Sequence, residues 1–175
     1  INVITPNKKS NSGSFQFYKD IREAKAKANV SFLYETTVGA GLPVISTLKE
    51  IIATGDKVLE IEGVLSGTLS YIFNNLKVNQ SFSSIIKDAK KLGYTEPDPR
   101  DDLSGVDVAR KLVILAREIG LEVELKDVFV ESLVPSDLVN VSLDEFMNKL
   151  VNFDFLMNLR LQSAENNDEV LRFVG

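Results

Sequence analysis

The stretch "GYTEPDPRDDLSGVDVARKLVILAREIG", residues 93–120, joins an acidic loop to a strongly apolar helical pattern. Five carboxylates and two prolines lie within residues 93–107. From Val108 onward, apolar side chains recur every three or four residues, which predicts an α-helix with a buried face. Because proline restricts the backbone, we expect a rigid loop that delivers carboxylates to the start of a core helix.

Lys111 occupies an unusual place on this predicted helix. At about 100° per residue it falls between apolar positions, whereas Arg110 and Arg117 share the polar strip. At least the aliphatic stem of Lys111 is therefore expected to be buried, with Asp107 one turn earlier beside it. A buried ammonium next to a carboxylate can act as a proton donor.

A purely structural interpretation of the same residues stays open. Ser104 and Asp107 have the spacing of a capping box, so Asp107 can simply satisfy backbone N–H groups at the helix start. Lys111 can extend its charged end to water. Helix geometry alone does not choose between capping and catalysis.

The acidic loop also has two interpretations. Asp101 and Asp102 can form a solvated turn, which is the common fate of a charge run. A calcium loop is excluded because the EF-hand spacing does not fit. The remaining possibility is that the carboxylates bind a small substrate that carries an ammonium group.

The composition limits the chemistry that this chain can perform. It has 175 residues, 44% hydrophobic and 26% charged, as expected for one soluble globular domain. It contains no Cys and no His, which excludes disulfides, thiol nucleophiles, Cys/His zinc sites and Ser-His-Asp triads. Proton transfer must use Lys, Asp, Glu, Tyr or water.

Charge and hydropathy exclude two classes of partner. The net charge of -5 and the absence of a Lys/Arg stripe argue against nucleic acid. Apolar runs are much shorter than the roughly 20 residues of a membrane helix, so no membrane partner is expected. We expect a cytoplasmic protein.

The order of predicted elements favours an α+β fold. Predicted strands and helices alternate irregularly, which indicates a mixed sheet with helices packed on one face. The predicted strands cover residues 1–4, 30–39, 57–65, 128–135 and 169–175. The predicted helices lie within 12–30, 40–55, 67–76, 81–93 and 151–163, after Ser104, and after the capping box that begins at Ser142.

The turn "TVGAGLP" contains Gly39 and Gly41 but lacks a dinucleotide-binding fingerprint. Its open backbone could turn carbonyl groups inward beside Glu35, and carbonyls with one carboxylate suit a hard cation. The spacing alone favours an ordinary strand-to-helix turn.

The sequence resembles the homoserine dehydrogenase family over essentially its whole length. The matching stretches are "TPNKK", "YETTVGAGLPVI", "GVLSGTLSYIFN", "KKLGYTEPDPRDDLSGVDVARKLVILARE" and "VLRFVG". In sequence, these stretches are most similar to the form of the enzyme that is fused to aspartokinase. The resemblance implies interconversion of L-aspartate 4-semialdehyde and L-homoserine with NAD or NADP, an oxidoreductase step in threonine and methionine biosynthesis.

The resemblance also implies roles for individual residues. Lys111 resembles the proton donor to the aldehyde oxygen, and Lys8 resembles the lysine beside the nicotinamide and the substrate. Glu96 and Asp107 resemble the carboxylates that bind the substrate amino group, with Asp101 in support.

Two further ligand sites are implied in the same way. Gly93 resembles a backbone contact to the cofactor, and Lys8 resembles a second cofactor-binding residue. A monovalent cation, sodium or potassium, is implied at four residues, the last three acting through carbonyls: Glu35, Val38, Ala40 and Leu42.

We therefore expect residues 1–175 to form the substrate-binding and dimerisation domain of this enzyme. The nucleotide-binding Rossmann domain of the family is absent from the chain, so the chain alone is expected to be inactive. The free sheet face is expected to form a homodimer. Two other classes stay open: a non-catalytic dimerisation module, and a regulatory module that binds an amino acid.

Overall fold

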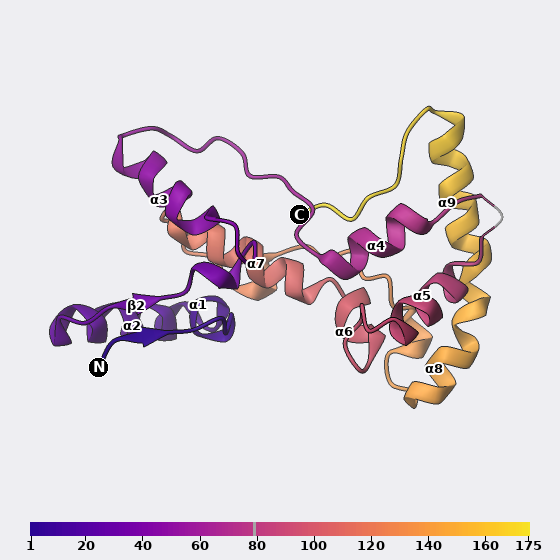
Figure 1. The fold of residues 1–175 in the computed structure, drawn as a ribbon, viewed down its shortest axis with the longest axis horizontal. Coiled ribbons are helices and arrows are strands. Elements are labelled where there is room, and N and C mark those ends of the chain that lie inside the picture. The colour runs from indigo at the N-terminus through magenta and orange to yellow at the C-terminus, as the bar shows by residue number, and fades with distance from the viewer. Residues whose placement is uncertain (79) are drawn as a thin grey trace. The chain divides into compact units, whose positions relative to one another are not determined.

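The computed structural model describes residues 1–78 and 80–175. The chain divides into two compact units. The first unit comprises residues 1–65, 108–129 and 175, and the second comprises residues 66–107 and 130–174. Figure 1 shows the path of the chain through both.

The first unit contains a two-stranded parallel sheet, in which Val3 and Ile4 pair with Phe32 and Leu33. Parallel strands need a crossover connection, and helices between the two strands provide it (Figure 1). The elements of this unit are β1 (Val3–Ile4), α1 (Lys9–Ser12), α2 (Phe15–Ala28), β2 (Phe32–Leu33), α3 (Val44–Ala53) and most of α7 (Val106–Glu118).

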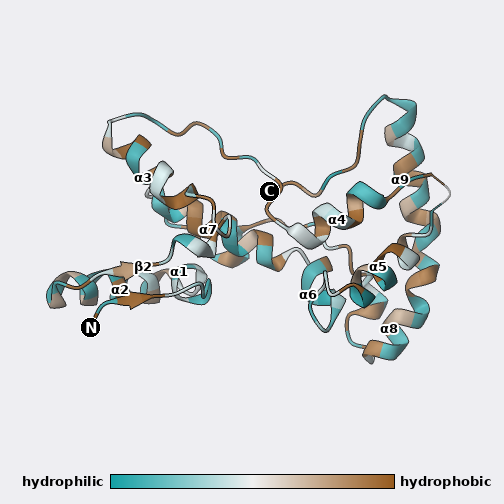
Figure 2. Ribbon diagram, viewed as in Figure 1, coloured by the Kyte–Doolittle hydropathy of each residue, from teal (hydrophilic) through white to brown (hydrophobic). Residues whose placement is uncertain are grey.

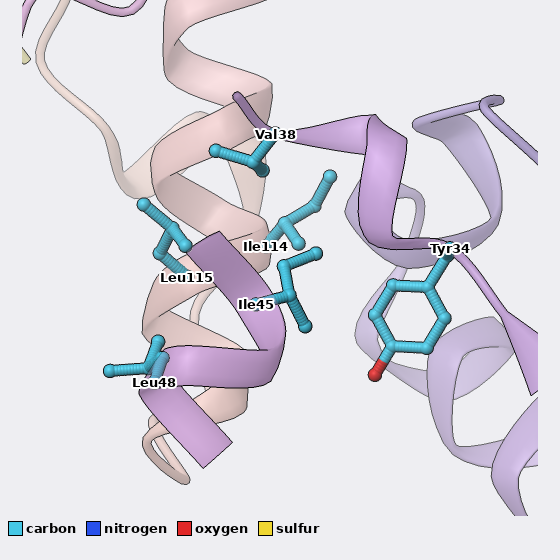
Figure 3. Packing of buried hydrophobic residues seen from close by; sticks show 6 residues of the cluster. All are labelled: Tyr34, Val38, Ile45, Leu48, Ile114 and Leu115. Atoms are coloured by element: carbon cyan, nitrogen blue, oxygen red, sulfur yellow. The ribbon is translucent and has the colours of Figure 1, made fainter. Parts of the chain in front are cut away.

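The core of the first unit forms where α3 packs on α7. Figure 3 shows side chains of both helices and of the preceding segment meeting there. The buried cluster consists of Tyr34, Val38, Ile45, Leu48, Ile114 and Leu115. Burying each large aliphatic side chain of this kind contributes about 1.5–3 kcal/mol. This cluster therefore holds α7, and with it the backbone of Lys111, against the rest of the unit.

The second unit is helical among its described residues. Its elements are α4 (Gly67–Asn75), α5 (Phe82–Lys91), α6 (Pro99–Leu103), α8 (Leu143–Lys149) and α9 (Asp154–Asn166). Asp154 joins α9 to the start of α5, because its carboxylate accepts hydrogen bonds from the Ser83 N–H at 2.6 Å and from the Ser81 and Ser83 hydroxyls. This long-range cap fixes how α5 and α9 meet.

The structure confirms the α+β class and the predicted helix starts. Ser14, Ser81 and Ser142 cap α2, α5 and α8, each accepting a backbone N–H three residues later. Pro43 precedes α3, and Gly55, with φ of 85°, follows its end. These signals depend only on neighbouring residues, so they do not depend on the tertiary structure.

The extended mixed sheet predicted from the sequence is not seen in the described part of the chain. Segments 57–65, 128–135 and 169–175 carry no strand assignment there. Gly63 and Gly175 exchange two backbone hydrogen bonds of 3.0 Å, which is as far as pairing goes between those two segments. An alternating pattern of polar and apolar residues favours a strand, but the strand forms only where a neighbouring segment provides the partners for its backbone hydrogen bonds.

The burial of segment 57–65 also differs from that of a regular strand. Polar and apolar residues alternate along it in Figure 2, a pattern that in a strand would place Leu59 and Ile61 on one buried face. Val58 and Ile61 instead pack against the α3–α7 core, while Leu59 is 94% exposed. The strict two-residue alternation therefore fails between residues 58 and 61.

Candidate active site

The acidic loop of the second unit contains a short helix that the sequence pattern did not predict. Asp98 accepts a hydrogen bond from the Arg100 N–H at 2.9 Å and caps α6, whose first residue is Pro99. Proline is well suited to the first helical position because its missing N–H would be unpaired there. The two prolines therefore start a helix rather than hold the whole loop extended.

Arg100 anchors this loop to a distant segment. Its guanidinium pairs with the Asp98 carboxylate at 2.6 Å and donates to the carbonyl of Val141 at 2.8 Å and that of Val139 at 3.1 Å. The hydrogen bond from Arg100 lowers the pKa of Asp98, and the same bond raises the pKa of Arg100. Asp98 is thus engaged in holding the loop.

The first half of the loop is fixed by three further contacts. The Thr68 hydroxyl donates to the Tyr94 carbonyl at 2.6 Å, and the Lys90 ammonium donates to the Pro97 carbonyl. Asp102 accepts the backbone N–H of Glu96 at 2.8 Å. The carboxylates of the loop therefore divide into two kinds: Asp98 and Asp102 serve the loop itself, whereas Glu96 and Asp101 are exposed.

Ser104, expected to open a capping box with Asp107, lies between α6 and α7. The Ser104 hydroxyl accepts the N–H of Val106 at 3.3 Å, two residues on, and Ser104 itself ends α6. Gly105, with φ of 71°, makes the turn between α6 and α7. Asp107 lies in the first turn of α7 and is half-buried.

Lys111 lies within α7 with a partly buried side chain, as predicted from helix geometry. Its neighbours Val108, Ile114 and Leu115 are buried. Its ammonium donates to the backbone carbonyl of Leu65 at 2.5 Å. This bond fixes the direction of the ammonium, which is the charged end of the side chain.

Lys8 immediately precedes α1 and follows strand β1 and a compact polar turn. The Asn7 N–H donates to the Thr5 hydroxyl at 3.0 Å, and the Lys9 N–H donates to the Asn7 side chain at 2.8 Å. The Ser12 hydroxyl donates to the Lys8 carbonyl at 2.9 Å. The "TPNKK" segment is therefore a defined turn that ends a strand, a common location for functional groups.

The candidate residues belong to both units. Lys8 and Lys111 are in the first unit, and Gly93, Glu96 and Asp101 are in the second. Asp107 precedes Lys111 by four residues on α7, a spacing that places both side chains on one helix face.

Glu35, predicted as a cation ligand, caps helix α3 in the structure. Its two carboxylate oxygens accept the N–H groups of Ile45 at 2.8 Å and Ser46 at 3.0 Å. The Leu42 carbonyl accepts the N–H of Val44 at 2.9 Å. The turn between them contains two residues with positive φ, Gly39 at 79° and Ala40 at 51°. The presence of Glu35 at this turn is thus explained without an ion.

Gly93 has the backbone freedom that a cofactor contact requires. Its φ is 76°, and a Cβ built on it would meet no atom within 4 Å. The position is therefore open, and a planar or phosphorylated ligand can approach its backbone closely.

Sequence reasoning missed the importance of Arg117, which it placed on a polar strip. The Arg117 side chain is 0% exposed, and it donates to the carbonyls of Asn11 at 2.8 Å and Gly13 at 2.9 Å. Burial lowers its pKa, and the nearby Glu124 opposes that effect. The available signal was its spacing of seven residues, or two helical turns, from Arg110, because this spacing places both arginines on the same face of α7.

A model of one protein family matches residues 43–175 of the chain, and that family is described as homoserine dehydrogenase. The match covers more than half of the chain and includes the acidic loop and α7. The chain belongs to the homoserine dehydrogenase family.

Relatives of this family align with the chain from end to end. A bifunctional aspartokinase/homoserine dehydrogenase 2, chloroplastic, from Arabidopsis thaliana is 54% identical over 100% of the chain, which covers 19% of that protein. A homoserine dehydrogenase from Schizosaccharomyces pombe is 51% identical over 100% of the chain, which covers 48% of it. The chain therefore spans half or less of the length of these relatives.

Solved structures show the same architecture. A Candida auris protein described as of unknown function superposes with a TM-score of 0.95 at 47% identity, over 100% of this chain and 51% of that one. A hyperthermophilic archaeal homoserine dehydrogenase in complex with NADPH superposes with a TM-score of 0.62 at 29% identity, over 67% of this chain and 36% of that one. NADPH binding is thus observed within the homoserine dehydrogenase family.

Within the described residues, no helix is both long enough and apolar enough to span a membrane.

Proposed function

We propose that this chain is the substrate-binding and catalytic portion of an enzyme that reduces L-aspartate 4-semialdehyde to L-homoserine with NADH or NADPH. The observation that carries the proposal is the oriented ammonium of Lys111, held by the Leu65 carbonyl on a helix that also bears Asp107. Membership of the homoserine dehydrogenase family supports this choice of reaction.

Lys111 is proposed to supply the proton. When bound, the reduced nicotinamide supplies hydride to the aldehyde carbon. As negative charge develops on the aldehyde oxygen, the Lys111 ammonium stabilises it and donates a proton to it. Because the donor is already fixed and partly buried, it needs little reorientation when the charge develops. Water would have to reorient at that stage, so the fixed donor stabilises the charge better.

The carboxylates Glu96 and Asp107 are proposed to hold the substrate ammonium, with Asp101 nearby in the chain. Glu96 and Asp101 are exposed, whereas Asp98 and Asp102 accept backbone N–H groups of the loop. Lys8 and the open backbone at Gly93 are proposed to face the cofactor.

A monovalent cation, sodium or potassium, is proposed at the carbonyls of Val38, Ala40 and Leu42 with Glu35, whose oxygens have lone pairs beyond those that cap α3. Excess stability in potassium over tetramethylammonium chloride would support it, and equal stability would oppose it. Cytoplasmic location is likewise a proposal, which fractionation of the source cells tests.

A second copy of the chain is proposed to cover the exposed apolar side chains of the unpaired segments. Leu59 and Phe129 are 94% and 91% exposed, and Val170 is 72% exposed. Apolar side chains on extended segments without a ladder are typical of surfaces that pair. Sedimentation equilibrium of the protein at its natural length should give a dimer or a larger oligomer, and a monomer would refute this.

Glu96→Gln tests the substrate assignment in the full-length protein. The variant should raise KM for L-aspartate 4-semialdehyde by about 10-fold or more, because a charge-assisted hydrogen bond contributes about 1.5–3 kcal/mol. Succinate semialdehyde lacks the ammonium, so its turnover should not change. Glu23→Gln on exposed α2 is the matched control. Equal effects on both aldehydes would contradict the assignment.

A further inference from the structure

We propose that Arg117 is a positioning residue, which fixes the turn that carries Lys8 and so sets the place of Lys8 relative to Lys111. The inference deepens the proposed function and rests on the role proposed there for Lys8. All three residues belong to the first unit.

Two of the carbonyls that accept hydrogen bonds from Arg117 lie three and five residues after Lys8. The Arg117 guanidinium donates to the carbonyls of Asn11 and Gly13 on one side and to the Val123 carbonyl, at 2.8 and 3.1 Å, on the other. The rings of Phe15 and Tyr18 lie 5.4 and 5.2 Å from the guanidinium carbon. A buried cation is costly unless such acceptors compensate it, so the whole arrangement must form together.

The α1 turn depends on this support. It has four residues, and a single helical turn is not stable by itself. Within the turn, the Lys8 carbonyl accepts the Ser12 N–H at 2.8 Å and the Ser12 hydroxyl at 2.9 Å. Ser12 is 1% exposed, so these bonds are made away from water. The backbone of Lys8 is therefore tied to the turn that Arg117 holds.

Helix α7 holds the turn at two points and also carries Lys111. Arg110, two helical turns before Arg117, donates to the Ser12 hydroxyl at 3.3 Å. Lys111 is the next residue, directed to the Leu65 carbonyl. One rigid helix thus fixes both lysines: Lys111 directly, and Lys8 through Arg110 and Arg117. A displacement of about 1 Å in such a group can lower the rate about 100-fold.

A double-mutant cycle in the full-length protein tests this inference. Arg117→Lys, Lys8→Met and the double variant are compared by kcat for aldehyde reduction with both substrates saturating. Arg117→Lys should lower kcat about 10- to 100-fold in the native background, and less than about threefold once Lys8 is replaced. The effects of the two substitutions on kcat are then not additive. An arginine with only a structural role would lower kcat by the same factor in both backgrounds.

The control is Ile45→Val, which loses about 1 kcal/mol of stability from the α3–α7 core without touching α1. Its kcat should not change in either background. If Arg117→Lys does not fold, as judged by circular dichroism, Ser12→Ala takes its place, because it removes the hydroxyl that joins Lys8 to Arg110. The same loss of about 10-fold or more, and the same coupling to Lys8→Met, are expected.

The possible failures are distinguishable. Equal losses of kcat in both backgrounds, or a native kcat in Arg117→Lys, overturn the inference while leaving the proposed function intact. A native kcat in Lys8→Met refutes the role of Lys8 and the inference with it. A native protein that does not reduce the aldehyde refutes the proposed function itself.

Discussion

Replacing Gly105 by alanine should destabilise the protein by about 2–5 kcal/mol. Gly105 has φ of 71°, and placing a Cβ in that region costs roughly 1–2 kcal/mol. The new Cβ would lie 2.7 Å from Phe173 Cζ and 2.8 Å from Val130 Cγ1, and overpacking of this kind costs about 1–3 kcal/mol. The glycine therefore serves both the backbone turn and a close packing contact.

Gly120→Ala is the matched control for the packing part of this loss. Gly120 has φ of 90°, but a Cβ there would meet nothing within 4 Å. It should lose only about 1–2 kcal/mol from backbone strain. Urea unfolding followed by far-ultraviolet circular dichroism measures both losses, provided that the slopes with denaturant agree. Equal losses in the two variants would refute the packing argument and the close fit at the α6–α7 junction.

Three further predictions concern side chains outside the proposed chemistry. The carboxyl pKa of Asp98, followed by NMR, should lie below its ordinary value of 3.8 and return toward that value in Arg100→Gln. The stabilisation of the fold by the Asp98–Arg100 pair is therefore present above pH 3.8 and is lost as the pH falls through the folded-state pKa. An unchanged pKa in the variant would contradict the pairing. Glu35→Ala should cost about 0.5–2 kcal/mol of unfolding free energy even in tetramethylammonium chloride, since α3 loses its cap, and no loss there would refute the capping role. Arg160→Ala should change the unfolding free energy by less than about 1 kcal/mol, because its partner Glu131 is 61% exposed; a larger loss would show a contact beyond that pair.

Local signals in the sequence predicted the helices well. The capping serine Ser142 and the amphipathic spacing of α7 act within a few residues, so they hold in any tertiary context. Helix geometry also placed the Lys111 stem among apolar side chains correctly. The Asp98-Pro99 pair was a helix-start signal too, and it was missed because two prolines suggested an extended loop.

Features that depend on distant residues could not be predicted in the same way. The strand predicted at residues 57–65 needs a partner that its own pattern does not specify. Arg117 looked solvent-facing because its acceptors, the carbonyls of Asn11, Gly13 and Val123, include two from residues about a hundred positions earlier in the chain. The acidic loop, similarly, gave no indication of which carboxylates would be used by Arg100 and by the Glu96 N–H.

The most direct test of the central claim is the rate of aldehyde-dependent NADPH oxidation by the full-length protein when Lys111 is replaced by methionine. Lys27→Met, an exposed lysine of α2, is the matched control and should keep the native rate. Removal of a general acid is expected to lower kcat of the Lys111 variant about 100- to 10,000-fold, with native folding retained. A near-native kcat would contradict the account and would favour a dimerisation or amino-acid-binding module instead.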